Sequence, residues 1–204
     1  MTQAQAQARV LVIRHGRTAW NRERFLGRVD VPLDSVGRAQ ARTVADVLAD
    51  DVLDRLWSSP LQRAMCTAQP LAERCGLVPR ARAELSELDC GEWQGQLTSD
   101  PDAKISTRDP ELAMPGGESI SDAWRRIEVF LHSVALDLRG GASVVVGHYV
   151  VNQLLVAQLL GQPVDRALRS AAYRPAPGSV LELVWSAGIW RSEGFRVTAL
   201  AGQR

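Results

Sequence analysis

The sequence predicts an α/β fold, a three-layer sandwich in which a mostly parallel central sheet has helices on both faces. Short β-branched runs that fit buried strands alternate with longer segments whose apolar residues recur every three or four positions. The 204 residues, 46% hydrophobic and 23% charged, have the ordinary composition of one globular domain. We therefore expect a single domain over residues 9–204, preceded by a flexible tail over residues 1–8.

The strands are expected where apolar runs are short and are bounded by glycine, proline or charged residues. The run Val10–Ile13, for example, is β-branched and is followed by Arg14, His15 and Gly16. The last two strands are separated only by Ser186-Ala187-Gly188, which predicts a terminal β-hairpin. The expected strands are residues 10–13, 52–57, 77–82, 142–146, 180–185 and 189–199.

The helices are expected where apolar residues recur at helical spacing after a polar capping residue. Residues 93–117 have no such period and are rich in Asp, Pro and Gly, so we interpret them as a surface excursion that can act as a lid. The helices are expected after Asp34 or Ser35, after Ser58-Ser59-Pro60 as far as Gly76, from Ser119, which pairs with Asp122, to Leu138, and between His148 and Gly161.

The composition argues against several classes of protein. The 24 basic and 23 acidic residues give a net charge of +1, which does not favour non-specific binding of nucleic acid. Three cysteines without a Cys-x-x-Cys pair fit neither a disulfide framework nor a cysteine zinc site, and they favour a reducing compartment. The polar N-terminal segment has no apolar signal core, and no run reaches the ~20 apolar residues of a membrane span. We expect a cytoplasmic protein.

Polar residues follow three of the predicted strands at the point where each strand ends. Arg14 and His15 follow the first strand, Arg63 comes soon after the second, and His148 follows a later one. Ligands of open α/β sheets bind outside the carboxyl ends of the strands. We therefore expect these four side chains to form a functional site.

Two histidines and two arginines together suit the chemistry of a phosphoryl group. Neutral imidazole is a nucleophile, and guanidinium groups match the phosphoryl oxygens in charge and geometry. Arg14 and Arg63 also favour a neutral imidazole at His15, because nearby cations disfavour imidazolium. A leaving alkoxide needs a proton, and one of the carboxyl groups within Glu84–Trp93 could donate it.

Six ordered blocks of the sequence resemble the histidine phosphatase superfamily, also called phosphoglycerate-mutase-like. The first, Arg14-His15-Gly16-Arg17-Thr18-Ala19-Trp20-Asn21, is similar to the signature of that family. One such octet would be suggestive, whereas six blocks in the family's order make a chance match improbable. The other five blocks are 27–41, 58–64, 84–95, 115–119 and 146–148.

The resemblance implies a role for each matching residue and a metal-independent phosphomonoesterase without a cofactor. His15 would be the nucleophile that becomes phosphohistidine, and Glu87 would be the proton donor, chosen over its neighbours Glu84, Asp89 and Glu92. The residues implied to bind the phosphoryl oxygens are Arg14, Arg63, His148 and Asn21. Those implied to line the mouth of the substrate pocket are Thr18 and Gly27.

Two residues depart from the family pattern. Arg17 stands where Glu or Gln is usual, so it either adds a third cation that favours a second anionic group or points away and pairs with an acid. Tyr149 stands where Gly commonly follows the second histidine, so its ring either narrows the pocket or packs on the sheet. We include both in the expected substrate site. His132 is expected at the surface, and Cys90 is not expected to be a nucleophile.

Three alternatives to a phosphatase stay open. A phosphoglycerate-type mutase uses the same chemistry, although the short segment 90–95 resembles the phosphatase form. A metal hydrolase would use His15, His148 and a carboxylate as ligands, but two arginines beside them would repel the metal. A non-catalytic phospholigand-binding protein would have the pocket without turnover. The expected partner is a small phosphorylated metabolite, with no nucleic acid or membrane, and a homodimer is one option for the assembly.

Overall fold

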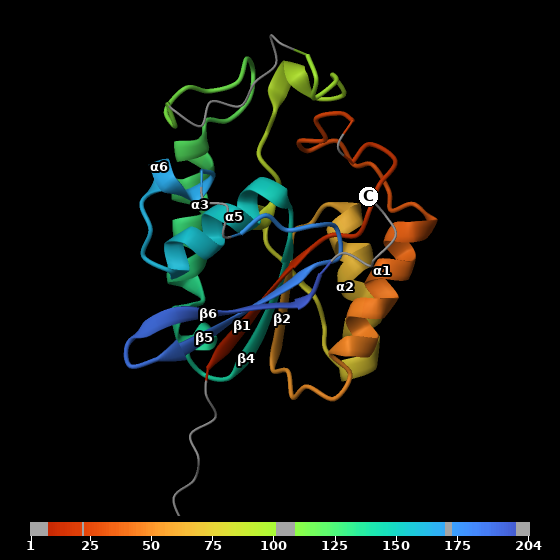
Figure 1. Cartoon of the computed structure of the whole chain (residues 1–204), viewed down its shortest axis with the longest axis vertical. Coiled ribbons are helices and arrows are strands. Elements are labelled where there is room, and N and C mark those ends of the chain that lie inside the picture. The colour runs from red at the N-terminus through yellow and green to blue at the C-terminus, as the bar shows by residue number, and fades with distance from the viewer. Residues whose placement is uncertain (1–7, 22, 101–108, 170–172, 199–204) are drawn as a thin grey trace, which may run out of the picture.

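The computed structural model describes residues 8–21, 23–100, 109–169 and 173–198, and it has the predicted α/β architecture (Figure 1). Residues 1–7 of the expected tail and residues 101–108 of the expected lid lie outside the described residues. Ala8, which we assigned to the tail, is buried, and its carbonyl accepts a hydrogen bond from the Trp185 N–H at 2.8 Å. The elements are β1 (Arg9–Arg14), α1 (Ser35–Val47), β2 (Arg55–Ser58), α2 (Gln62–Cys75), β3 (Arg80–Ala81), η1 (Ala83–Leu85), η2 (Gly91–Trp93), α3 (Ile120–Ser133), α4 (Ala135–Leu138), β4 (Ala142–Gly147), α5 (Tyr149–Leu159), α6 (Val164–Ala167), β5 (Val180–Ser186) and β6 (Ile189–Val197).

The six strands form one sheet in the order β3-β2-β4-β1-β5-β6. The pairs β3–β2, β2–β4 and β4–β1 are parallel. β5 pairs antiparallel with β1 and forms the expected antiparallel hairpin with β6. Because β1, β2 and β4 are parallel neighbours, their carboxyl ends meet at one edge, where Arg14 pairs with Gly147 and Ser58 with Val146.

Both faces of the sheet are covered by helices. In Figure 1, α1 and α2 lie on one face and α3, α5 and α6 on the other. Side chains of β1 alternate between the two cores: Val10 and Val12 pack on the side of α3 and α5, while Leu11 and Ile13 pack on the side of α1 and α2. A strand buried on both faces reads as a continuous apolar run, which is why β1 and β4 could be recognised.

Three predicted boundaries were wrong in detail. α2 begins at Gln62, later than the Ser58-Ser59-Pro60 cap implies, and no side chain caps it. The expected long helix ends at Ser133, and α4 follows after Val134, whose φ of −117° interrupts the helix. The strand expected over 77–82 is only the two residues of β3. Within the described residues, no helix combines the length and apolar character that would cross a bilayer.

Candidate active site

His15 begins the loop after β1 and is fixed by backbone contacts on both sides. The backbone N–H of His15 donates to the Gly147 carbonyl at 2.9 Å, and the backbone N–H of the neighbouring Gly16 donates to Thr67 Oγ1 at 3.0 Å. Gly16 lies so close to α1 that a Cβ there would be 2.4 Å from the Gly37 carbonyl oxygen. The imidazole is 2% exposed, and its Nδ1 lies 2.7 Å from the Gly16 carbonyl oxygen. A carbonyl only accepts, so Nδ1 carries the proton and Nε2 has the free lone pair.

His148 lies directly after β4, beside His15. The two ring centroids are 5.1 Å apart, and His148 is fully buried. Its Nε2 is 2.7 Å from Ser59 Oγ, which already accepts from the Leu61 N–H at 3.3 Å. The Nδ1 atom of His148 has no hydrogen-bond partner among the residues that the structure describes.

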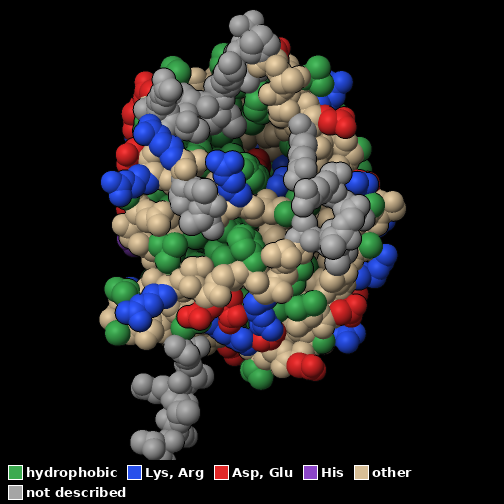
Figure 2. Space-filling model, viewed as in Figure 1, with side chains coloured by type: hydrophobic (Ala, Val, Ile, Leu, Met, Phe, Trp, Pro, Cys, Tyr) green, Lys and Arg blue, Asp and Glu red, His purple; other side chains and the backbone are tan. Residues whose placement is uncertain are grey.

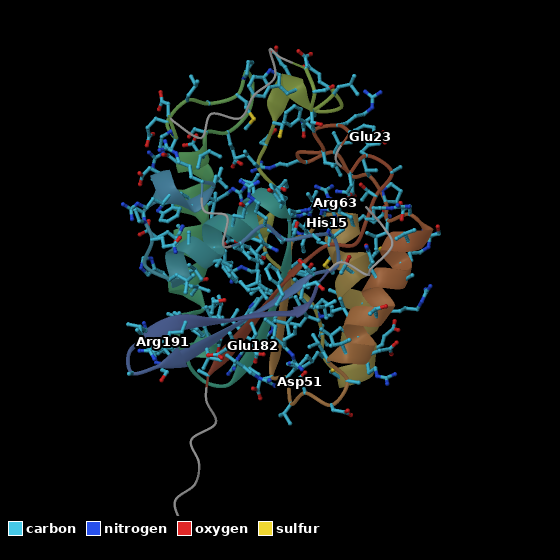
Figure 3. The ribbon with its side chains drawn as sticks, in the orientation of Figure 1. His15, Glu23, Asp51, Arg63, Glu182 and Arg191 are labelled. Atoms are coloured by element: carbon cyan, nitrogen blue, oxygen red, sulfur yellow. The ribbon has the colours of Figure 1, made fainter. Side chains whose placement is uncertain are left out.

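The two predicted arginines contribute positive charge to the same place, as Figure 3 illustrates for Arg63 beside His15. Arg63, in the first turn of α2, is fully buried and donates to the carbonyls of Val29 at 2.6 Å and Gly27 at 2.7 Å. Arg14 ends β1 and donates to the Pro175 carbonyl at 2.8 Å. Its guanidinium carbon lies 4.9 Å from the centroid of the Tyr149 ring.

The charges and the burial keep both imidazoles neutral. The pKa of His15 is lowered well below 6.5, first by burial and then by the positive charges of Arg14 and Arg63. The pKa of His148 is lowered well below 6.5 by burial, then by Arg63 and by His15. A neutral His15 with a free Nε2 is the form that can attack an electrophile.

Glu87 brings a carboxyl group to the site from the segment after η1. Its Oε1 accepts from the N–H groups of Leu88 at 3.0 Å and Val151 at 3.2 Å, and its Oε2 accepts from Val150 at 3.3 Å. Two of these donors belong to the first turn of α5, where backbone N–H groups have no partner within the helix. The carboxyl is therefore held at a defined position, with 9% of the residue exposed.

A cavity of about 660 Å³ is lined by His15, Arg14, Arg63 and Glu87. It lies outside the carboxyl ends of the parallel strands, as expected for an open α/β sheet. Besides the predicted residues Arg14, His15, Asn21, Gly27, Arg63, Glu87 and Tyr149, its described lining includes Arg24, Phe25, Leu26, Leu88, Cys90, Thr98, Val150, Gln153, Leu168, Arg174, Pro175 and Ala176.

Three predicted site residues lie outside this lining: His148, which is fully buried beside His15, Thr18 and Arg17. Thr18 is buried, and both its N–H and its hydroxyl donate to Asn21 Oδ1, at 2.6 and 3.2 Å, so it fixes Asn21 instead of facing the cavity. Arg17 pairs through Nε with Asp34 Oδ2 at 2.7 Å and does not supply a third cation to the cavity. The alternative interpretation of Arg17, that it pairs with an acid, agrees with this contact.

Other chemistry is disfavoured at the same place. Burial, followed by the charges of Glu87 and Asp89, raises the pKa of Cys90 to about 12, so the thiol stays protonated and is a poor nucleophile. Among the described residues, no group of three or more His, Cys, Asp or Glu side chains is arranged to hold a metal ion. The two histidines instead have Arg14 and Arg63 as their charged neighbours.

The family model of the histidine phosphatase superfamily, branch 1, matches residues 10–198. The chain belongs to this superfamily. It is 34% identical over 210 residues to the glucosyl-3-phosphoglycerate phosphatase of Mycobacterium tuberculosis, covering 90% of this chain and 94% of the relative. It is 32% identical over 201 residues to a probable phosphoglycerate mutase of Yersinia pestis, covering 93% of each. The structure of a mycobacterial glucosyl-3-phosphoglycerate phosphatase in complex with VO3 matches with a TM-score of 0.80 and 32% identity, covering 92% of this chain and 98% of that one.

Several lining residues that sequence reasoning missed in this histidine phosphatase come from irregular segments, whereas Val150 and Gln153 lie in α5. Phe25 and Leu26 lie between two motif blocks, and Leu168 and Arg174 lie between α6 and β5. None of them belongs to a periodic pattern or follows a strand. Gly27 was predicted because it stands within a recognisable block of the sequence, which these four residues do not.

Proposed function

We propose that this chain hydrolyses phosphate monoesters of small metabolites through a phosphohistidine on His15. The observation that carries the proposal is the combination of a neutral His15, with Nε2 free, and two guanidinium groups in one cavity with Glu87. Membership of the superfamily and similarity to named phosphatases support the same reaction class.

In the first step, Nε2 of His15 attacks phosphorus and the bond from phosphorus to the ester oxygen breaks. Glu87 gives its proton to that oxygen, so the leaving group departs as a neutral alcohol. In the second step, Glu87 takes a proton from water, the water oxygen attacks phosphorus, and the bond between Nε2 and phosphorus breaks. Inorganic phosphate is released, and both groups return to their starting forms.

The phosphoryl oxygens are bound by Arg14, Arg63, His148 and Asn21. We assign the Ser59 hydroxyl as the donor to Nε2 of His148, an arrangement in which Ser59 Oγ still accepts from the Leu61 N–H. His148 then carries its proton on the buried Nδ1, which is available as a donor to a phosphoryl oxygen. Asn21 can offer its amide N–H groups, since its Oδ1 is occupied by Thr18.

The cavity also constrains the rest of the substrate. Its volume of about 660 Å³ lies within the range of small-molecule pockets and exceeds what a phosphoryl group needs. Phe25, Leu26 and Leu168 offer apolar walls, and Arg174 adds a cation. We therefore expect phosphate esters with leaving groups of sugar size or larger to be hydrolysed with a higher kcat/KM than methyl or ethyl phosphate. Assays with a panel of phosphorylated metabolites would measure this difference.

The test of the reaction uses p-nitrophenyl phosphate in excess EDTA. The wild-type protein should release phosphate, and His15→Ala should abolish the release, while the exposed histidine of α3 provides a matched control in His132→Ala. Wild-type protein that is denatured in alkali during turnover should carry a phosphoryl group, because the nitrogen–phosphorus bond of phosphohistidine survives base but not acid, and His15→Ala should carry none. Loss of activity in EDTA would favour the metal hydrolase, and an unchanged His15→Ala rate would remove His15 from its role.

The mutase named among the relatives is the second candidate, because it needs the same phosphohistidine. A mutase would return the phosphoryl group to a second hydroxyl of the substrate faster than to water. Incubation with 3-phosphoglycerate separates the two: we expect free phosphate to appear faster than 2-phosphoglycerate.

We place the protein in the cytoplasm, because Cys66, Cys75 and Cys90 are all free thiols, as a reducing compartment favours. Cell fractionation tests this. The face in Figure 2 carries both basic and acidic side chains. That the protein does not bind nucleic acid stays a prediction, which a mobility-shift assay would test. A homodimer stays a prediction, which light scattering on the purified protein would decide.

A further inference from the structure

Two arginines from separate segments converge on the backbone carbonyl of Glu87. Arg126, in α3, donates from Nη2 to this oxygen at 3.2 Å and from Nη1 to the carbonyl of Glu84. Arg28, in the loop after β1, donates from Nε to the Glu87 carbonyl at 3.4 Å. Both polar groups of Glu87 are therefore held by hydrogen bonds. The two arginines bind its backbone carbonyl, and N–H groups of α5 bind its side-chain carboxylate.

Glu118 joins the two arginines into one network. Its Oε1 accepts from Arg28 Nη2 at 2.7 Å and from Arg126 Nε at 3.0 Å, while its Oε2 accepts from Arg126 Nη2 at 3.1 Å and from the Asp89 N–H at 3.0 Å. The side chains of Arg126 and Glu118 are 16% and 18% exposed. Such a shielded, bidentate pair has more geometric constraint than an exposed ion pair.

The network also reaches the phosphoryl-binding side. Arg28 lies between Gly27 and Val29, whose carbonyls accept from Arg63. The short segment that contains Arg28 therefore contacts both the proposed proton donor and the phosphoryl-binding arginine. A displacement at Glu118 would be transmitted to the Glu87 backbone through two guanidinium groups.

We propose that Arg126, acting with Glu118 and Arg28, is a positioning residue that aligns the Glu87 carboxyl with the leaving oxygen. This inference rests on the proposed function, because it assumes that Glu87 is the proton donor. Proton transfer requires the donor within hydrogen-bond distance of the leaving oxygen, and a small misplacement of a catalytic group costs a large factor in rate. None of the three network residues lines the cavity, so they act on the site through the backbone of Glu87.

The test compares Arg126→Lys with two substrates that differ in their need for a proton. Lysine keeps the charge but cannot contact Glu118 and two carbonyls together. For glycerol 2-phosphate, whose alkoxide needs a proton, we expect kcat to fall about tenfold or more, while for p-nitrophenyl phosphate it falls less than about twofold. The matched control is Arg125→Lys, at a neighbouring arginine of α3 that is 59% exposed and pairs with Glu111 and Asp122; neither substrate should be affected.

A double-mutant cycle distinguishes positioning from a structural role. If Arg126 acts through Glu87, then Arg126→Lys should lower the rate of glycerol 2-phosphate hydrolysis much less in a Glu87→Gln background than in the wild type. Equal loss on both substrates by a folded Arg126→Lys protein, or additive losses in the cycle, would overturn the proposal. If Arg126→Lys does not fold, Glu118→Gln and Arg28→Lys leave Arg126 in place and must give the same substrate-selective loss.

The outcomes separate this inference from the function on which it rests. Should Glu87→Gln itself slow both substrates equally, or should the wild type hydrolyse neither, the proposed function fails. Should Glu87→Gln be selective and the network variants not be, only the positioning role of Arg126 fails.

Discussion

At the scale of single residues, the site depends on which nitrogen of each histidine carries its proton. A backbone carbonyl sets this for His15, because the Gly16 oxygen can only accept. For His148, the proposed assignment has the Ser59 hydroxyl donate to Nε2. This assignment leaves a lone pair on the ring of His15 and an N–H on the ring of His148, as the proposed attack on phosphorus and binding of the phosphoryl oxygens require.

The depressed pKa of His15 predicts the acid limb of the pH profile. The active form is neutral imidazole, and a pKa well below 6.5 keeps it neutral as the pH falls through 6.5. The kcat/KM for p-nitrophenyl phosphate should therefore stay near its plateau at pH 6.5 and fall only at lower pH. A half-maximal value at or above pH 6.5 would contradict the depressed pKa.

The proposed proton position on His148 predicts the effect of Ser59→Ala. Without the hydroxyl, Nε2 loses its partner and the proton is no longer directed to Nδ1, so binding of the phosphoryl oxygens should weaken. We expect the inhibition constant for vanadate to rise about tenfold, the equivalent of one hydrogen bond. Ser58→Ala is the control, since Ser58 is equally buried but donates to a carbonyl at 2.9 Å. Equal effects of the two substitutions would remove the role of Ser59.

At the scale of elements, a close approach between the loop after β1 and the start of α1 holds His15 in place. Gly16→Ala would put a Cβ 2.4 Å from the Gly37 carbonyl oxygen, and backbone cannot move aside as a side chain can. We expect a loss of about 1–3 kcal/mol in the free energy of unfolding and a reduced kcat. Gly140→Ala, whose Cβ would be 3.2 Å from the Leu136 carbonyl oxygen, should cost less in urea unfolding and leave kcat unchanged.

The same elements explain which parts of the site the sequence could predict. Arg14, His15, Arg63 and His148 were predictable because parallel strands end at one edge of a sheet, whatever the details of the loops. The contact of Thr18 with Asn21 could not be predicted, because a block of sequence does not reveal which side chain of a loop turns inward. The predicted cap of α2 was wrong for a related reason. The side chain of Ser59 contacts His148 and the Leu61 N–H instead of capping the helix.

The apolar walls and the network around Arg126 could not be predicted from local patterns. Phe25 and Leu168 face the cavity only because segments far apart in sequence meet there. Arg126 and its neighbour Arg125 look alike on the helical pattern, yet one is shielded against Glu118 and the other is exposed. Only the tertiary packing of α3 against the Glu87 segment distinguishes the two arginines.

At the scale of the whole molecule, the ionic groups at the two ends of the sheet have different tasks. The proposed catalytic groups lie at the carboxyl ends of the parallel strands, while Asp51 and Glu182 lie toward the opposite end (Figure 3). There Asp51 pairs with Arg9 and Arg196, both at 2.8 Å, and Arg9 also lies 3.5 Å from Glu182. This cluster connects β1, β5 and β6 to the turn after α1, so it should affect stability without affecting the reaction.

Asp51→Asn tests this separation. Burial alone would raise the pKa of Asp51, but hydrogen bonds from Arg196 and Arg9 outweigh it and hold the pKa below 3.8. A carboxyl whose pKa is lower in the folded than in the unfolded protein stabilises the fold at pH values above its unfolded-state pKa. This contribution is lost as the pH falls through its folded-state pKa. We expect Asp51→Asn to lower the free energy of unfolding by about 1.5 kcal/mol at neutral pH, with kcat unchanged.

Urea unfolding of Asp51→Asn and wild type should then converge as the pH is lowered below 3.8, because the wild-type carboxylate becomes protonated and resembles the amide. Asp46→Asn is the matched control, since Asp46 is 66% exposed and lies 3.5 Å from Arg74. Exposed pairs of this kind contribute little, so its effect should stay within about 0.5 kcal/mol at every pH. A pH-independent difference for Asp51→Asn would mean that packing, and not the charge on Asp51, holds this end of the sheet together.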